Sequence, residues 1–486
     1  MLFNSYVYIL LFLPVTLSGY YLTARRSDKV SKVWLVFASL FFYAYWVPGY
    51  LFLIVASMCV NYVLATRIAA SRAQAPTQPP SKFLPVVGLV FNLGLLGYYK
   101  YADFFITNIN VSFGIHIPLL QLLLPLAISF FTFQQIAYLM DVHQGKAKSY
   151  GFLNYALFVT FFPQLIAGPI VHHGEMMPQF ANVRNGFFNP RNFSHGIFLF
   201  SIGLFKKVII ADTFGVWANA GYDQPSQLTF FPAWATSLSY TFQIYFDFSG
   251  YTDMALGSAK LFNIELPTNF NTPYRADNIQ EFWRRWHMTL SRWLRDYLYI
   301  PLGGNRKGGS RTYLNLVLTF LLGGLWHGGA WTFVVWGLLH GVATAVHKLW
   351  ASSGRQLSGL SGWLLTFAFL NVTWVFFRAP DVETAVNLLK SMVGMNGTVF
   401  PKQLSTLEWL AGYDLTFGKM FAGIGNAYEI LFLTVLFGVL SVLGKNSLGL
   451  LKDYLPKRKW TYATTFLLLY ALNNLDRVSE FLYFNF

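Results

Sequence analysis

Uncharged apolar runs alternate along this chain with short basic loops. The first runs cover residues 2–22, 33–66 and 83–99. Runs of this kind predict membrane-spanning helices, which need about 17 to 25 apolar residues. The run at 33–66 is interrupted once, by Pro48 and Gly49, so it predicts two helices joined by a turn.

The pattern continues to the end of the chain and predicts about 11 spans in total. Residues 104–116 carry Asn108, Asn110 and His116, so we expect an outer loop there and a helix at about 119–140. The remaining runs are residues 192–210, 224–246, 312–347, 356–377, 430–444 and 460–474. The predicted fold class is an all-α polytopic membrane protein with additional re-entrant helices.

One apolar run does not have the pattern of a plain helix. Residues 150–174 contain FFPQLIAGPIVHHG, with two prolines and two glycines at membrane depth. Proline removes a helical hydrogen bond. Such breaks are tolerated in a membrane only where protein or a water-filled cavity covers the backbone. This stretch therefore predicts a broken or re-entrant segment.

Residues 278–297 show helical periodicity in a basic stretch of the chain. Four large side chains recur at i, i+4, i+7 and i+11 and share one face: Trp286, Leu290, Trp293 and Tyr297. Asn278 stands three residues before Glu281, a variant of the capping box that begins helices. A basic, Trp-rich helix of this kind lies in the membrane interface or re-enters the membrane.

The composition excludes a soluble protein. Of 486 residues, 55% are hydrophobic and only 11% are charged, against about 25% charged in soluble domains. The net charge is +15, and such an excess belongs mainly to cytoplasmic loops that face anionic membrane lipids. Residues 273–311 hold eight basic and three acidic residues, so we expect them to be cytoplasmic. The basic residues are scattered between apolar runs, so nucleic-acid binding is not expected.

The run at 312–347 spans 36 residues without Asp, Glu, Lys or Arg, and His327 lies inside it between two glycine pairs. An ionisable side chain at membrane depth is costly, which predicts a functional site. Glycine pairs let a backbone or a ligand come close. The alternative is a packing histidine at a helix crossing, which small residues also favour.

Three further polar clusters lie in or beside apolar runs. His287 is either catalytic or an interfacial anchor in its Trp-rich helix. Asp247 and Asp253 are expected to cap helices or to pair with arginines. His172 and His173 are expected to be loop residues near the surface. A histidine can act as a general base near neutral pH, which makes these clusters candidates for acyl transfer.

Arginine and tryptophan side chains around His287 form a stripe that either anchors the interface or contacts the phosphates of a nucleotide-linked donor. The predicted substrate-binding residues are Trp326, Trp283, Arg284, Arg285, Asp247 and Asp253. The single cysteine, Cys59, excludes an internal disulfide and a Cys-based metal site, and no metal site is predicted. No Walker loop, G-x-S-x-G elbow or HExxH motif occurs, so ATPase, α/β-hydrolase and zincin activities have no support.

Taken together, these segments resemble the membrane-bound O-acyltransferase family. The stretches that carry the resemblance are FFPQLIAGPI, DFSGYTDMALGSAKLFNIELPTNFNTPY, FWRRWHMTLSRWLRDYLYIPLGGNR, LLGGLWHGGAWTFVVWGLLHG, WVFFRA and FLYFNF. The resemblance runs nearly end to end. It points to the bacterial branch that includes alginate O-acetyltransferase and the D-alanyl transfer protein of teichoic acid synthesis. It implies one domain over residues 1–486, with a helical ring around a central tunnel.

The resemblance also implies a reaction. His327, in the WHG motif, is the implied catalytic histidine, and His287, in FWRRWH, has a supporting or acceptor-side role. The expected function is transfer of an acetyl group from a cytoplasmic donor, acetyl-CoA, for O-acetylation of an exported polysaccharide such as alginate. No further cofactor is expected. The expected partner is a periplasmic or extracellular protein of the SGNH-hydrolase type, and the expected location is the bacterial cytoplasmic (inner) membrane.

Two alternatives stay open. Within the family, the acceptor could be another polymer, as in cellulose acetylation or D-alanyl transfer to teichoic acid from a carrier protein. Outside the family, the protein could be a transporter or channel in which His327 relays protons. Imidazole-dependent acyl transfer in vesicles would favour the enzyme, and solute flux without a covalent product would favour transport.

Overall fold

The computed structural model describes residues 1–74, 81–355, 357, 359–407, 415–455, 457–477 and 481–482. Most of the Pro-rich loop at 73–81 and of the closing FLYFNF sequence lies outside these residues. The described chain is mainly helical and divides into two compact units. The single domain over residues 1–486 stays a prediction.

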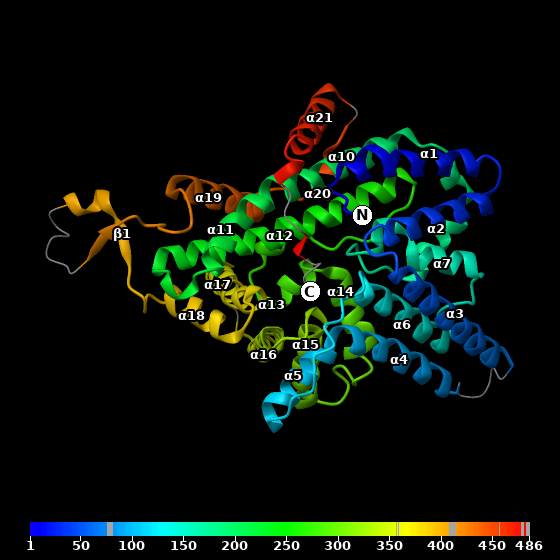
Figure 1. The fold of residues 1–486 in the computed structure, drawn as a ribbon, viewed down its shortest axis with the longest axis horizontal. Coiled ribbons are helices and arrows are strands. Elements are labelled where there is room, and N and C mark those ends of the chain that lie inside the picture. Colours follow the sequence, from blue (N-terminus) through cyan, green and yellow to red (C-terminus); the bar gives the residue numbers. More distant parts are fainter. Residues whose placement is uncertain are drawn as a thin grey trace. The chain divides into compact units, whose positions relative to one another are not determined.

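The first unit consists of residues 1–205, 250–269 and 451–475. Its main helices are α1 (Leu13–Ala24), α2 (Asp28–Ala44), α3 (Tyr50–Gln74), α4 (Phe83–Leu96), α5 (Ala102–Phe113), α6 (Ile128–Gln144), α7 (Phe152–Thr160), α8 (Phe162–Leu165), α9 (His173–Ala181), α10 (Pro190–Phe205) and α21 (Arg458–Leu472). A π-helical turn, Val7–Phe12, precedes α1, and another, Gly97–Tyr101, joins α4 to α5. Figure 1 shows α2 beside α7, and α10 packs against α21.

Two predictions for this unit are confirmed. The run at 33–66 forms α2 and α3, which are separated by the turn at Pro48 and Gly49. The Pro/Gly-rich run is broken into α7 and α8, and residues 155–171 are all buried. Protein therefore covers the interrupted backbone, as an irregular segment at membrane depth requires.

The expected outer loop at 104–116 is wrong, because most of it is helix α5. The side chain of Asn108 donates to the carbonyl of Phe104, 2.7 Å away, so the amide is satisfied along the helix. Helix α6 begins later than expected, at Ile128, after Ala127 with a left-handed φ of 63°. Pro125 disfavours helical geometry in the residue before it, and the left-handed Ala127 sets the start of the helix.

The second unit consists of residues 206–249, 270–450 and 476–486. Its main helices are α11 (Asp212–Tyr222), α13 (Ile279–Arg285), α14 (Met288–Leu294), α15 (Gly309–His327), α16 (Trp331–Ser352), α17 (Gly359–Arg378), α18 (Val382–Met392) and α19 (Ala427–Leu443). Helix α12 (Phe230–Leu261) contributes its first part to this unit, and α20 (Ser447–Asp453) begins in it. Figure 1 shows α16, α17 and α18 packed side by side.

Side-chain caps begin several of these helices. Asn278 accepts the backbone N–H of Glu281 at 2.8 Å at the start of α13, which confirms the predicted cap. Asp381 accepts from Thr384 in the same way at the start of α18. Such caps satisfy N–H groups that have no partner within the helix. Beyond α18, β1 (Val399–Pro401) pairs in parallel with β2 (Thr416–Gly418).

Four helical segments in the described chain are long and apolar enough to cross a membrane: Val7–Ala24, Tyr50–Gln74, Phe83–Phe113 and Gly359–Arg378. The pair α19 and α20, bent by 63°, would make a fifth. The protein is thus a multi-pass membrane protein, but the 11 predicted spans are not confirmed. Several predicted spans are instead short or interrupted helices, and the ring and tunnel stay predictions.

Candidate active site

His327 is the last residue of α15 and lies in the second unit. Only 4% of its surface is exposed. Its ring packs against Trp326, Trp336 and Phe377, with ring centroids 5.0, 5.1 and 5.0 Å away. Gly328, which follows, is extended and ends the helix. The imidazole therefore sits in an aromatic enclosure at the turn between α15 and α16.

The glycines near His327 allow α15 and α16 to cross closely. A Cβ atom on Gly324 would lie 2.3 Å from the carbonyl oxygen of Phe333. A Cβ on Gly337 would lie 2.5 Å from the carbonyl oxygen of Phe320. Both distances are shorter than real Cβ contacts, so these positions accept only glycine. These glycines therefore make the close crossing of α15 and α16, and this crossing positions the buried imidazole.

His340 is a second buried histidine of this cluster, and the sequence reasoning missed it. Trp283 donates its indole N–H to Nδ1 of His340 at 3.2 Å. Nε2 lies 3.1 Å from the hydroxyl of Thr373, which itself donates to the Leu370 carbonyl. Nδ1 therefore accepts and Nε2–H donates, so the network assigns a neutral tautomer. His340 lies in the same uncharged run as His327. Its position in that run could have indicated a second buried histidine.

One tryptophan links the two histidines. The Trp336 ring lies 5.1 Å from the ring of His327 and 4.7 Å from that of His340. Trp283, a predicted substrate-binding residue, packs against the same tryptophan at 5.8 Å. Trp283 is thus a wall of the aromatic cluster that also holds His340 through a hydrogen bond.

The predicted continuous helix at 278–297 is wrong, because the chain breaks at Trp286 and His287. Trp286 is extended, and His287 has a left-handed backbone with φ of 42°. Of the predicted apolar face, Trp286, Leu290 and Trp293 are buried. The sequence pattern does not show this break, because the apolar positions of α13 and α14 follow one helical repeat across it.

The break buries His287 completely. Its ring packs against Phe248 of α12 at 4.8 Å and against Trp326 at 6.2 Å. Trp326 also touches His327, so both predicted catalytic histidines share this tryptophan as a neighbour. His287 therefore lies between two short helices and not within one helix. The structure therefore brings His287, Trp326 and His327 together.

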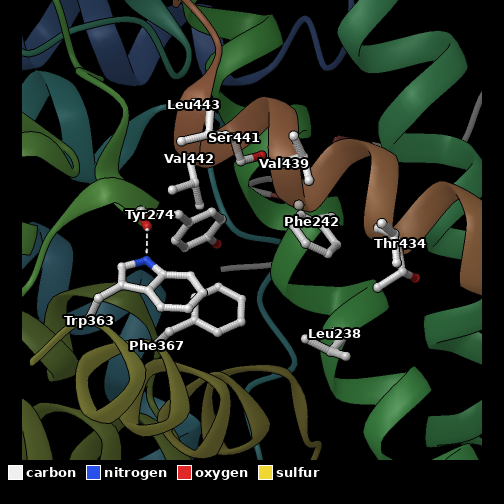
Figure 2. A pocket seen from close by; sticks show the side chains of 12 residues that line it. Leu238, Phe242, Tyr274, Trp363, Phe367, Thr434, Val439, Ser441, Val442 and Leu443 are labelled. Atoms are coloured by element: carbon white, nitrogen blue, oxygen red, sulfur yellow. Dashed lines mark hydrogen bonds between the residues drawn. The ribbon is translucent and has the colours of Figure 1, made fainter. Parts of the chain in front are cut away.

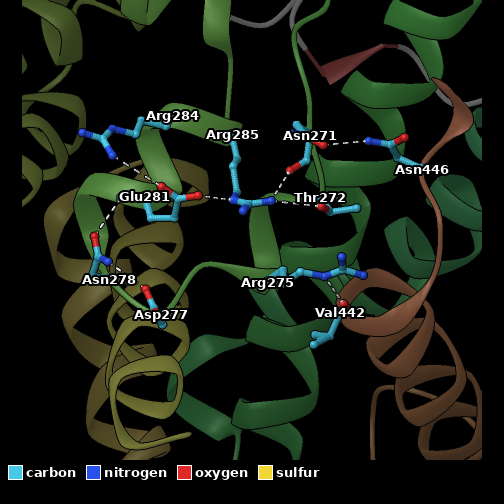
Figure 3. Close-up of polar contacts among 10 residues, drawn as sticks. All are labelled: Asn271, Thr272, Arg275, Asp277, Asn278, Glu281, Arg284, Arg285, Val442 and Asn446. Atoms are coloured by element: carbon cyan, nitrogen blue, oxygen red, sulfur yellow. Dashed lines mark hydrogen bonds and ion pairs between the residues drawn. The ribbon is translucent and has the colours of Figure 1, made fainter. Parts of the chain in front are cut away.

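Arg284 and Arg285 both pair with Glu281 of the same helix (Figure 3). Arg285 binds Glu281 at 2.6 Å and donates to the carbonyl of Asn271 at 3.2 Å. Arg284 is exposed and lies 3.8 Å from Glu281. These contacts tie α13 to the preceding loop, and a role in donor binding stays a prediction.

Asp247 belongs to a buried ion cluster. Lys207 lies 2.9 Å from Asp247 and 2.6 Å from Asp212, with all three side chains at most 9% exposed. The backbone N–H of Leu482 also donates to Asp247 at 3.1 Å. The expected pairing thus involves a lysine in place of an arginine. Asp253, further along α12, is buried in the first unit, and its role stays a prediction.

His172 and His173 lie in the first unit. His173 is only 7% exposed and lies 3.1 Å from Asp141, and His172 lies 3.8 Å from the same carboxylate. The expectation of surface loop residues is therefore wrong for His173. The carboxylate that contacts His173 belongs to α6, 32 residues earlier in the chain. A local sequence pattern could not show this contact.

The imidazoles of His287, His327 and His340 are thus all buried among aromatic side chains of the second unit. The model of the membrane-bound O-acyltransferase family matches residues 144–379, which contain His287, His327 and His340. A peptidoglycan O-acetyltransferase of Helicobacter pylori is 46% identical over the whole of this chain and 98% of its own length. The chain therefore belongs to the membrane-bound O-acyltransferase family and is an O-acyltransferase.

Two further relatives show how the likeness extends. A probable alginate O-acetylase of Pseudomonas aeruginosa is 40% identical over 81% of this chain and 75% of its own length. A teichoic acid D-alanyltransferase of Bacillus subtilis is 30% identical over 50% of this chain and 64% of its own length. These relatives favour the acyltransferase over the transporter or channel alternative.

Proposed function

We propose that this protein transfers an acetyl group from cytoplasmic acetyl-CoA towards an exported envelope polysaccharide, with His327 as the general base. The main support for this proposal is the aromatic enclosure of His327 at the end of α15, within the segment that matches the family. An enclosed site excludes water, which would otherwise hydrolyse the acyl group.

The proposed step needs one proton acceptor. The His327 imidazole takes the proton of the acceptor hydroxyl while the oxygen attacks the thioester carbonyl carbon. The carbon–sulfur bond breaks, and coenzyme A leaves as a thiol after it takes the proton from the imidazolium. His287, which shares Trp326 with His327, acts on the acceptor side.

The proposed path runs through the bacterial cytoplasmic membrane. Donor enters from the cytoplasm beside the basic residues 273–311, which the positive-inside rule assigns to that side. A tunnel in the helical ring carries the reaction to the other face. The attacking hydroxyl belongs to a periplasmic or extracellular partner of the SGNH-hydrolase type, which acetylates the sugar in a second step.

Peptidoglycan is the first acceptor to test, because a relative that aligns over this whole chain is a peptidoglycan O-acetyltransferase. Alginate or a similar exopolysaccharide is the second, because alginate O-acetylases are about as similar over a shorter stretch. D-alanyl transfer has less support, since that relative is 30% identical over half of the chain.

Mass spectrometry of cell-envelope polymers tests the proposal. A strain that lacks the protein is complemented with the wild type or with His327→Ala, and ester-linked acetyl groups are measured on muropeptides and on exopolysaccharide. We expect wild type alone to restore acetylation of one polymer, which identifies the acceptor. Unchanged acetylation of both polymers in the deletion strain would refute the proposed function.

A further inference from the structure

A groove of about 390 Å³ lies within the second unit, between α12, α17 and α19 (Figure 2). Aromatic rings from three elements line one part of it: Phe242, Tyr274, Trp363 and Phe367. Trp363 donates its indole N–H to the carbonyl of Tyr274 at 2.8 Å, which joins two of these walls. The α19 side contributes valines and Gly438, so the lining is almost entirely apolar.

The groove opens onto an exposed apolar helix. Val435, Val439 and Leu443 line it and are 63%, 50% and 74% exposed. The neighbouring Phe432 and Leu440 of α19 are also exposed. In a multi-pass membrane protein, such a surface faces lipid, because exposing a contiguous apolar helix face to water is unfavourable.

A basic mouth, formed around Arg275, lies next to the groove residues Tyr274 and Val442. Arg275, adjacent to Tyr274, donates to the carbonyls of Val442 and Gly444 at 2.6 and 3.3 Å. These bonds use two of the five guanidinium N–H groups, and the exposed side chain keeps the others for a ligand. Residues 271–285 and 442–446 hold four basic and two acidic residues. This balance favours an anionic group.

Two hydroxyls lie within the apolar lining. In the part of the chain that the structure describes, neither Ser441 nor Thr434 makes a hydrogen bond through its hydroxyl. Ser441 is 4% exposed and is adjacent to Val442, whose carbonyl binds Arg275. A buried hydroxyl of this kind needs an acceptor, and the ester carbonyl of a glycerolipid supplies one between chain and phosphate.

We propose that this groove binds one anionic phospholipid, with an acyl chain between α12, α17 and α19 and the phosphate against Arg275. An α-helix about 10 Å across fills about 800 Å³ for every 10 Å of length, so the groove is too small for a partner helix. It is large enough for an alkyl chain. The positive charge at the mouth favours a headgroup of net negative charge over a zwitterionic headgroup, whose phosphate is balanced by its own cation.

Spin-labelled lipids in phosphatidylcholine vesicles test the proposal. The probes are phosphatidylglycerol and phosphatidylcholine labelled on the acyl chain, and electron paramagnetic resonance measures the immobilised fraction. The wild type should bind phosphatidylglycerol about fivefold more tightly than phosphatidylcholine, as expected for one cation near an anionic lipid. Arg275→Gln should make the immobilised fractions of the two probes equal. The groove that holds the acyl chain should stay intact in this variant.

Gly438 allows the groove to be filled. A Cβ there would lie 3.6 Å from Phe242, an ordinary contact, so the first side-chain atom fits. The longer side chains of Gly438→Leu and Gly438→Trp are designed to extend into the groove and fill it. Both variants should lose the excess of immobilised phosphatidylglycerol over immobilised phosphatidylcholine. Leu440→Trp, on the same helix outside the groove, should keep this excess. An unchanged excess in folded Gly438→Leu would overturn the proposal. A wild type that does not distinguish the two probes would also overturn it. Neither outcome depends on acetyl transfer.

Discussion

At the scale of single residues, His287 combines complete burial with a backbone conformation that side chains rarely adopt. Its φ is 42°, and the left-handed region costs a residue with a side chain about 1–2 kcal/mol. Such strain clusters at functional sites, where the surrounding structure enforces it. Here the strained turn directs the imidazole towards Phe248 and Trp326.

His287→Asn and His287→Gly separate the imidazole from the turn. Asparagine and glycine both adopt the left-handed conformation readily, so both variants should keep the turn. His287→Asn, which leaves the smaller cavity, should be the more stable of the two. We expect both to lose transfer to the acceptor while donor is still loaded or hydrolysed. Full specific activity of either purified variant would show that only the turn at His287 matters.

His340 should act on stability and not on the reaction. His340→Leu leaves the buried indole N–H of Trp283 without its acceptor, which costs about 1–3 kcal/mol. We expect a lower unfolding temperature in detergent, with activity per folded molecule retained. His340→Gln, whose amide oxygen can accept from Trp283, is the matched control and should be more stable than His340→Leu. Lost specific activity at unchanged stability would assign His340 to the chemistry instead.

At the scale of helices, the α15–α16 crossing holds His327. Gly324→Ala places a Cβ 2.3 Å from the Phe333 carbonyl oxygen, so the helices must separate. Gly309→Ala, in the same helix, meets only a Tyr313 side-chain atom at 3.8 Å and is the control. We expect Gly324→Ala to reduce both yield and activity and Gly309→Ala to leave both unchanged, measured by fluorescence-detected chromatography and acyl transfer. Equal behaviour would contradict this role of the crossing.

The sequence predicts elements whose signals are local. The hairpin at Pro48, the broken run at 150–174 and the cap at Asn278 are of this kind. The break at His287 depends on packing against Phe248, nearly forty residues earlier, and no periodicity within 278–297 shows it. The partners of His340 and Asp247 are equally distant: Trp283 lies 57 residues from His340, and Lys207 precedes Asp247 by 40 positions.

At the scale of the whole molecule, the basic segment at 273–311 defines the expected orientation in the membrane. Asn305 is exposed in this segment, and Cys59 is the single cysteine of the chain. Asn305→Cys in a Cys59→Ala background should react with an impermeant thiol reagent only after the cells are permeabilised. Labelling in intact cells would place this segment outside and move the donor entrance to the other face.

The central claim is that His327 is the base of an acyl transfer. Purified protein in vesicles, supplied with radiolabelled acetyl-CoA and an acceptor fraction from the envelope, measures it directly through acetyl groups in ester linkage. We predict that His327→Ala and His327→Gln lower the transfer rate by about 10²–10⁴, as the loss of a positioned base does, while insertion and unfolding temperature stay unchanged. A folded His327→Ala protein that transfers acetyl groups at the wild-type rate would contradict the account.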